Sequence, residues 1–78
     1  MKFKENETVR IIKDFDGNVK KNDVGVVIMA FDEPREAYEV EILNENGEPK
    51  NQCTLLPDDL ELFIQIQESD TYNLSEGE

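Results

Sequence analysis

The sequence predicts one small all-β domain, a five-stranded β-barrel followed by an acidic tail. Its 78 residues suffice for one domain with one modest core. Apolar runs rich in Val and Ile stand between clusters of turn-forming residues, and none has the period of an amphipathic helix. With 37% hydrophobic and 35% charged residues, the chain still carries enough large apolar side chains to fold.

The first strand is predicted over residues 7–13. Val9 and Ile11 share one face there, which is the period-two pattern of a half-buried strand. Residues 14–18 end it, because Asp, Gly and Asn favour turns. Residues 19–23 are then expected to form a short polar loop.

The second strand is predicted over residues 24–31. It is apolar on both faces, so we expect it to be the most buried strand of the domain. A turn over residues 32–36 follows, because Pro34 lacks an amide donor and pushes Glu33 out of the α region.

The third strand, over residues 37–43, alternates cleanly between apolar and acidic side chains. Two carboxylates, Glu39 and Glu41, are expected to point to solvent. The side chains expected to point inward are Tyr38, Val40 and Ile42.

A hairpin turn over residues 45–48 is predicted to join the third strand to the fourth. Asn46 and Gly47 are the residue pair that supplies the two positive φ angles of a type I′ turn. The fourth strand is shorter and covers residues 51–55.

The domain is predicted to close with a helical turn and a fifth strand. Residues 56–60 form the turn, since Pro57 suits an opening helical position. The strand covers residues 61–66, so the barrel domain is predicted over residues 1–66. Residues 67–78 are acidic and poor in large apolar groups, which indicates a flexible, disordered or loosely attached tail.

Five short strands with a long first loop, tight later turns and a helical turn before the last strand are the plan of an SH3-like barrel. The ordered series ETVRII (7–12), VKKNDVGVV (19–27), AYEVEI (37–42) and TLLPDDL (54–60) resembles a family of small bacterial proteins of unknown function that is thought to be SH3-like. The resemblance implies a Lys-Gly-Asp-Val-Gly pattern in which this chain has Asn22 in place of the first Gly, and Asn also tolerates the left-handed region. The resemblance covers about residues 5 to 63. The resemblance implies that this protein accompanies a toxin-like protein. It would then act as the immunity protein for that toxin.

The charge of the chain is divided along its length. The 19 acidic and 8 basic side chains give a net charge of −11; the first 21 residues sum to +2 (6 minus 4) and the others to −13 (2 minus 15). Such a field either serves solubility or attracts a cationic partner. The acidic side chains expected to form the partner-binding surface are Asp32, Glu33, Glu36, Glu39, Glu41, Asp58, Asp59 and Glu61.

Two interpretations of these carboxylates remain open. In the first, they keep the surface solvated and are partly neutralised by Arg10 and Lys13 of the first strand. Alternatively, they dock a basic protein, such as a nuclease-like toxin domain, whose cationic groups they would occupy. The sequence therefore predicts a non-catalytic protein-binding module, best described as an immunity or inhibitor protein.

A second function class follows from residues 21–27. Their Asp-x-Gly-x-Val turn is similar to that of KOW-type barrels in transcription and ribosomal proteins. The alternative function is accordingly a module in a nucleic-acid or ribosome-associated assembly. It would use the basic residues Lys2, Lys4, Arg10, Lys13, Lys20 and Lys21. The net charge of −11 makes binding to nucleic acid unfavourable.

Catalytic, metal and cofactor sites are not expected. The chain has no His, the commonest general base and metal ligand. Cys53 lies in a predicted strand and is expected to be a buried, inert thiol. Asp58 and Asp59 are adjacent acids near a turn, which normally cap and solvate it. Residues 14–18 resemble a calcium loop but lack its bidentate Glu, so we interpret them as a turn.

Location and assembly are constrained only weakly. One cysteine allows no internal disulfide. The chain shows neither an apolar export signal nor a stretch of about 18 apolar residues, so we expect a cytoplasmic protein without a membrane span. The oligomeric state stays open, because a second subunit could complete a thin core.

Overall fold

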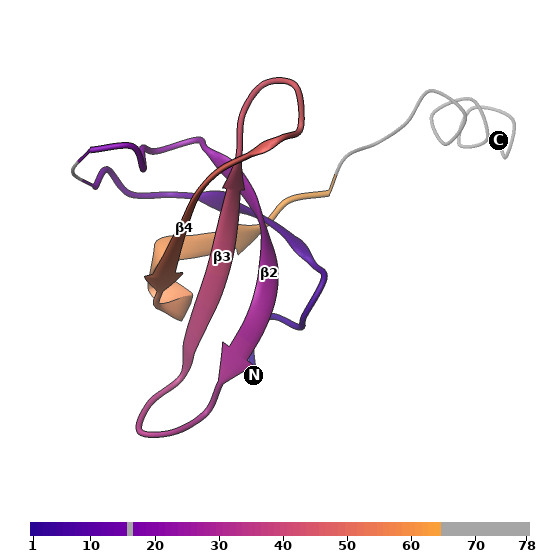
Figure 1. Ribbon diagram of the computed structural model, residues 1–78. Coiled ribbons are helices and arrows are strands. Elements are labelled where there is room, and N and C mark those ends of the chain that lie inside the picture. The colour runs from indigo at the N-terminus through magenta and orange to yellow at the C-terminus, as the bar shows by residue number, and fades with distance from the viewer. Residues whose placement is uncertain (16, 65–78) are drawn as a thin grey trace, which may run out of the picture.

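The computed structural model describes residues 1–15 and 17–64, and within them the protein is essentially all-β (Figure 1). This confirms the predicted fold class. The elements are β1 (Thr8–Ile11), β2 (Val24–Phe31), β3 (Ala37–Leu43), β4 (Pro49–Leu55), the 3-10 helix η1 (Pro57–Asp59) and β5 (Leu60–Leu62). The predicted tail, residues 67–78, lies outside the described residues.

All five strands belong to one antiparallel sheet in the order β4-β3-β2-β1-β5. In Figure 1, β2, β3 and β4 lie side by side at the front, and β5 (orange) crosses behind them. The sheet is thus strongly twisted around its inner side. No pairing between β4 and β5 closes it within the described residues, so a closed barrel is not confirmed.

The core fills the inner side of this twisted sheet. Alternate residues of β3 point into it, as predicted, and two residues outside the strands, Phe3 and Val19, join them. Val19 was expected in a polar loop, yet its side chain is buried. The buried cluster consists of Phe3, Val9, Ile11, Val19, Val27, Tyr38, Val40, Ile42, Leu55 and Leu60.

Two residues at the start of β2 have backbone requirements that suit their identities. Asn22 adopts a φ of +78°, which confirms its expected place in the left-handed region. Gly25 lies so close to β3 that a Cβ would be 2.6 Å from the carbonyl oxygen of Glu41. Glycine is therefore needed there for the approach of two backbones.

The turn between β3 and β4 is a hairpin, but the expectation of a type I′ turn was wrong. Gly47 has a φ of +81°, whereas Asn46 is not among the residues with positive φ. The side-chain oxygen of Asn44 instead accepts hydrogen bonds from the N–H groups of Asn46 and Glu48, each 2.9 Å long. The loop is longer than two residues, and an Asn side chain organises it.

The expectation that β2 is buried on both faces was also wrong. Its first half is enclosed, but Ile28, Met29 and Phe31 are exposed. The pairing of β1 with β2 ends at Thr8 and Val26, whereas β2 continues along β3 to Phe31. An apolar run is buried only where strands and core cover it.

Candidate partner-binding surface

The outer face of β3 carries two of the predicted site residues, Glu39 and Glu41. Directly paired residues share a face of an antiparallel sheet, so these side chains lie beside those of Thr54 and Gln52 on β4. Glu39 accepts hydrogen bonds from Thr54 Oγ1 (2.6 Å) and Gln52 Nε2 (2.9 Å). The side chain of Glu41 has no hydrogen bond or ion pair with the described residues, so its charge is available to a partner.

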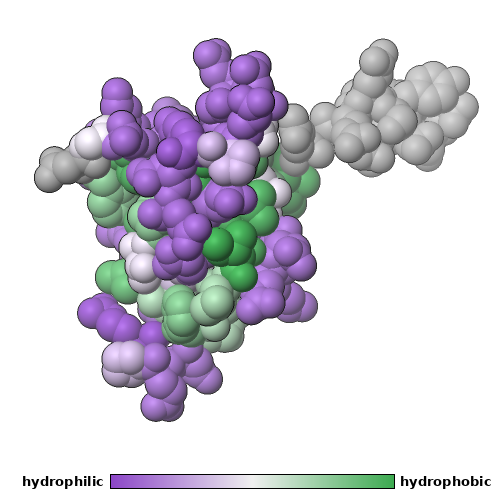
Figure 2. Space-filling view, viewed as in Figure 1, coloured by the Kyte–Doolittle hydropathy of each residue, from purple (hydrophilic) through white to green (hydrophobic). Residues whose placement is uncertain are grey.

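An apolar strip on β2 borders these carboxylates. Ile28, Met29 and Phe31 are 38%, 48% and 36% exposed, and Met29 pairs directly with Glu39. A β-bulge between Val27 and Met29 interrupts the register here. Figure 2 shows green side chains over β2 with purple ones over β3 and β4 beside them.

These apolar residues were missing from the sequence-based site. An uninterrupted apolar strand is typical of a buried strand, and no pattern within β2 marks the point where β1 stops covering it. We call the combined surface the hairpin face: Ile28, Met29, Phe31, Asp32, Glu33, Glu39 and Glu41.

The turn between β2 and β3 adds two exposed carboxylates, Asp32 and Glu33. Neither forms an ion pair with the described residues. Arg35, in the same turn, is exposed as well and brings one positive charge. The hairpin face and its turn therefore remain net acidic.

Glu36 was predicted as a site residue, but its carboxylate is tied to the fold. It accepts a hydrogen bond from the backbone N–H of Lys2 (2.8 Å) and another from the Tyr38 hydroxyl. These bonds, the one from Lys2 first, lower the pKa of Glu36 below its ordinary value. Tyr38 oxygen in turn accepts from the backbone N–H of Phe3 (3.1 Å). Burial, followed by the hydrogen bond to Glu36, raises the pKa of Tyr38.

The remaining predicted carboxylates lie on η1 and β5. Asp59 is only 8% exposed: it accepts from the backbone N–H of Leu56 (2.9 Å) and pairs with Lys13 (3.2 Å). Asp58, beside it, is exposed. Asp59 thus caps the helix start, as adjacent acids near a turn usually do.

Glu61 pairs with Arg10 of β1, which also donates to Asn22 Oδ1 (2.9 Å). Arg10 and Lys13 therefore neutralise Glu61 and Asp59, as the sequence suggested, and not Glu39 or Glu41. In the sheet, β3 and β5 are separated by β2 and β1, roughly 14 Å along the sheet. The structure divides the eight carboxylates into four on the hairpin face without an ion pair, three that the fold uses (Glu36, Asp59 and Glu61), and the exposed Asp58, which belongs to neither group.

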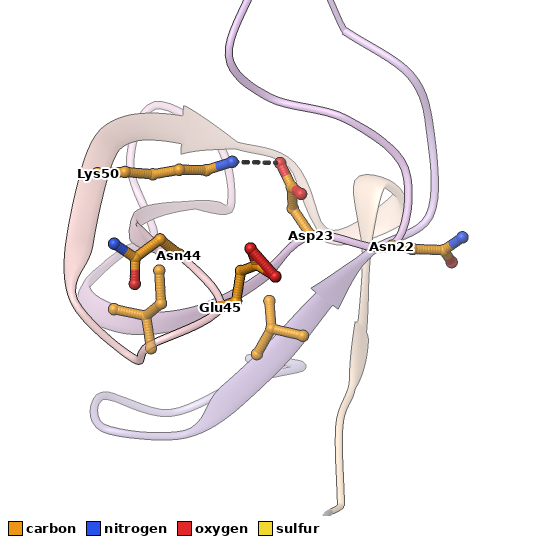
Figure 3. Close-up of a pocket in the computed structure, with 7 residues that line it drawn as sticks. Asn22, Asp23, Asn44, Glu45 and Lys50 are labelled. Atoms are coloured by element: carbon orange, nitrogen blue, oxygen red, sulfur yellow. Dashed lines mark ion pairs between the residues drawn. The ribbon is translucent and has the colours of Figure 1, made fainter.

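The opposite end of the sheet holds an open polar pocket of 470 Å³ (Figure 3). It lies between the start of β2 and the β3–β4 turn, and Asn44, Glu45 and Lys50 line it. The basic group of this pocket, Lys50 Nζ, pairs with Asp23 at 3.5 Å. The ammonium group of Lys50 is therefore already paired with a carboxylate of the protein.

Cys53 is half-buried and packs against the core beside a hollow of 220 Å³ lined also by Phe15 and Val19. Burial, and secondarily the charge of Glu39, raises the pKa of its thiol. A protonated thiol is a poor nucleophile. Within residues 1–15 and 17–64, no group of three or more His, Cys, Asp or Glu side chains could hold a metal ion.

The basic residues Lys20 and Lys21 are exposed in the loop between β1 and β2. Carboxylates accompany them: Asp23 accepts from the backbone N–H of Lys20 (2.9 Å) and Asp14 from that of Lys21 (3.2 Å). The loop is therefore mixed in charge. In the part of the chain that the structure describes, no helix has the length and apolar character needed to cross a membrane.

Comparison with known proteins gives a family but no activity. The sequence model of one protein family, described as a domain of unknown function (DUF4926), matches residues 5–62. This range includes all the described strands. No curated protein and no solved structure matches the chain.

Proposed function

The chain belongs to the DUF4926 family, whose function is unknown, and we propose that it is a non-catalytic protein-binding domain with a basic protein as its partner. The observation that carries this proposal is the hairpin face. There, the carboxylates of Asp32, Glu33 and Glu41 lack internal ion pairs with the described residues. Asp32 and Glu33 directly follow an exposed apolar strip, whose Met29 pairs with Glu39 on the same face as Glu41.

Charge and apolar area would play different parts in such a complex. The net charge of −11 attracts a cationic protein over distances of about a Debye length, 8 to 10 Å, and speeds association. Met29 and Phe31 belong to the residue types that fill the centres of interfaces. A surface with both features supports a specific complex better than carboxylates alone.

The partner that fits best is a nuclease-like toxin domain, which would make this chain an immunity protein. An enzyme that binds nucleic acid needs cationic groups for the phosphates. A domain that places its carboxylates on those groups excludes the substrate. The small size and acidic character of the chain agree with this role.

The first step of the test asks whether a neighbouring gene encodes a basic, nuclease-like domain, and the product of such a gene is then the partner used. Its affinity for this protein and its residual nuclease activity are measured between about 50 and 500 mM salt, with Glu41→Lys and Glu45→Lys compared. Glu45 is exposed on the β3–β4 turn, just beyond the end of β3 and outside the hairpin face. Both variants change the net charge by the same amount. A difference between them therefore reports the position of the charge, and equal effects report only the net charge.

We expect Glu41→Lys to weaken binding at least tenfold, about 1.4 kcal/mol, and to restore nuclease activity. Glu45→Lys should change affinity by less than about threefold. Equal effects of the two variants would mean that only the net charge matters. Unchanged affinity and salt dependence in Glu41→Lys would contradict the proposed surface.

A further inference from the structure

The second half of β2 has a free backbone edge. Toward β1, the last backbone hydrogen bonds of β2 are those of Val27, whose N–H donates to the Glu7 oxygen (2.9 Å) and whose oxygen accepts from Asn6 (2.7 Å). Beyond Val27, β2 pairs with β3 as far as Phe31. On the side away from β3, residues 28–31 form no backbone hydrogen bond with the described residues.

This edge lacks most of the features that protect edge strands. Charged residues, Pro and bulges usually prevent a further strand from pairing. Residues 28–31 are Ile, Met, Ala and Phe, and the bulge lies at their beginning. In Figure 1 the chain start emerges from behind the end of β2. The backbone N–H groups of Lys2 and Phe3 donate to Glu36 and Tyr38, and this segment forms no backbone hydrogen bond with residues 28–31.

We propose that residues 28–31 of β2 accept an extended cationic segment of the partner as an added strand of the sheet. This inference rests on the proposed function, since it specifies how the basic partner engages the hairpin face. The added strand would satisfy the free N–H and C=O groups of the edge, and its alternate side chains would contact Met29 and Phe31.

Charge complementarity identifies the occupant. The outward side chains of an added strand would lie two strand spacings from Glu39, roughly 10 Å, and a Lys or Arg side chain shortens that gap. Asp32 and Glu33 lie at the end of the same edge. A second copy would bring another net charge of −11 to this edge, which favours a basic segment over self-pairing.

The test compares two synthetic peptides with alternating Lys and Val residues and capped ends. One has an ordinary backbone, and the other carries N-methyl groups on alternate residues. The two peptides share charge and side chains, but the methylated one cannot donate along one edge. Binding to the full chain is followed by amide NMR shifts and by hydrogen exchange.

We expect the ordinary peptide to bind at least tenfold more tightly and to slow amide exchange within residues 28–31. Equal affinity of the two peptides would overturn the added strand but leave the proposed function intact, since that function is judged by Glu41→Lys and Glu45→Lys with the protein partner. No shift at about 1 mM ordinary peptide, or protection confined to other strands, would also overturn it. Concentration-dependent dimerisation that protects residues 28–31 without peptide would identify a second copy as the occupant instead.

Discussion

The two halves of β2 are both apolar, but their surroundings are opposite. Residues 24–27 lie between β1 and β3, with Val27 fully buried, whereas Ile28, Met29 and Phe31 are exposed. The difference comes from the neighbouring strand, because β1 covers only the first half. Burial of an apolar strand therefore depends on its partners more than on its own residues, and the uncovered half becomes a candidate binding surface.

The sharpest way to test the comparison is Gly25→Val in the covered half. The new Cβ would be 2.6 Å from the Glu41 oxygen and 2.7 Å from Val40 Cγ1. Backbone cannot move aside as a flexible side chain can, so we expect a loss of about 3 kcal/mol or more in the free energy of unfolding. Urea denaturation measures it. A loss below about 1 kcal/mol would show that β2 and β3 separate easily.

Truncation on either side of the bulge gives the next largest contrast. Val27→Ala removes two fully buried methyl groups and should cost about 2 kcal/mol. Met29→Ala removes a side chain that is 48% exposed and should cost less than about 0.5 kcal/mol. Thermal or urea unfolding of both variants decides this. Comparable losses would mean that the second half of β2 is covered in solution.

The hydrogen bonds at the start of β3, beside the β2–β3 turn, are tested by Tyr38→Phe. The variant leaves the Phe3 N–H without its acceptor and Glu36 without one donor, so we expect a loss of about 1 to 2 kcal/mol at neutral pH. The lowered pKa of Glu36 gives stability that is present above its unfolded pKa and is lost as the pH falls through the folded value. The variant should lose less stability on acidification, because only the bond from Lys2 remains.

The same variant also predicts a change at high pH. The raised pKa of Tyr38 contributes stability below its unfolded pKa, near 10, and this is lost as the pH rises through the folded value. Tyr38→Phe should lack that alkaline loss. Unfolding curves between about pH 3 and 11 measure both limbs. Profiles of the same shape for the two proteins would contradict the hydrogen-bond chain from Phe3 to Glu36.

Charge reversal on the hairpin face should have the smallest effect on folding. Glu41→Lys removes a carboxylate without an ion pair and relieves repulsion within a chain of net charge −11. We expect a change within about 0.5 kcal/mol, toward higher stability, for this variant and for Glu45→Lys. A large destabilisation by Glu41→Lys alone would assign that carboxylate to the fold and weaken its use as a binding group.

Part of the binding surface could be predicted from local pattern, and part could not. The alternation in residues 37–43 correctly placed Glu39 and Glu41 outside and Tyr38 inside. The ion pairs that remove Asp59 and Glu61 from the free set join residues 46 to 51 positions apart. No local pattern reveals such pairs.

The sequence by itself determined the order of the strands along the chain, the helical turn at Pro57 and the left-handed backbone conformation of Asn22. Side-chain alternation, proline chemistry and the tolerance of Asn for positive φ act within a few residues, so they can be seen in a single chain. Only the tertiary structure decided that β2 extends beyond the end of its pairing with β1, and that the side chains of Phe3 and Val19 belong to the core. Those outcomes depend on contacts between distant segments, and they turn part of an apolar strand into an exposed edge bordered by carboxylates.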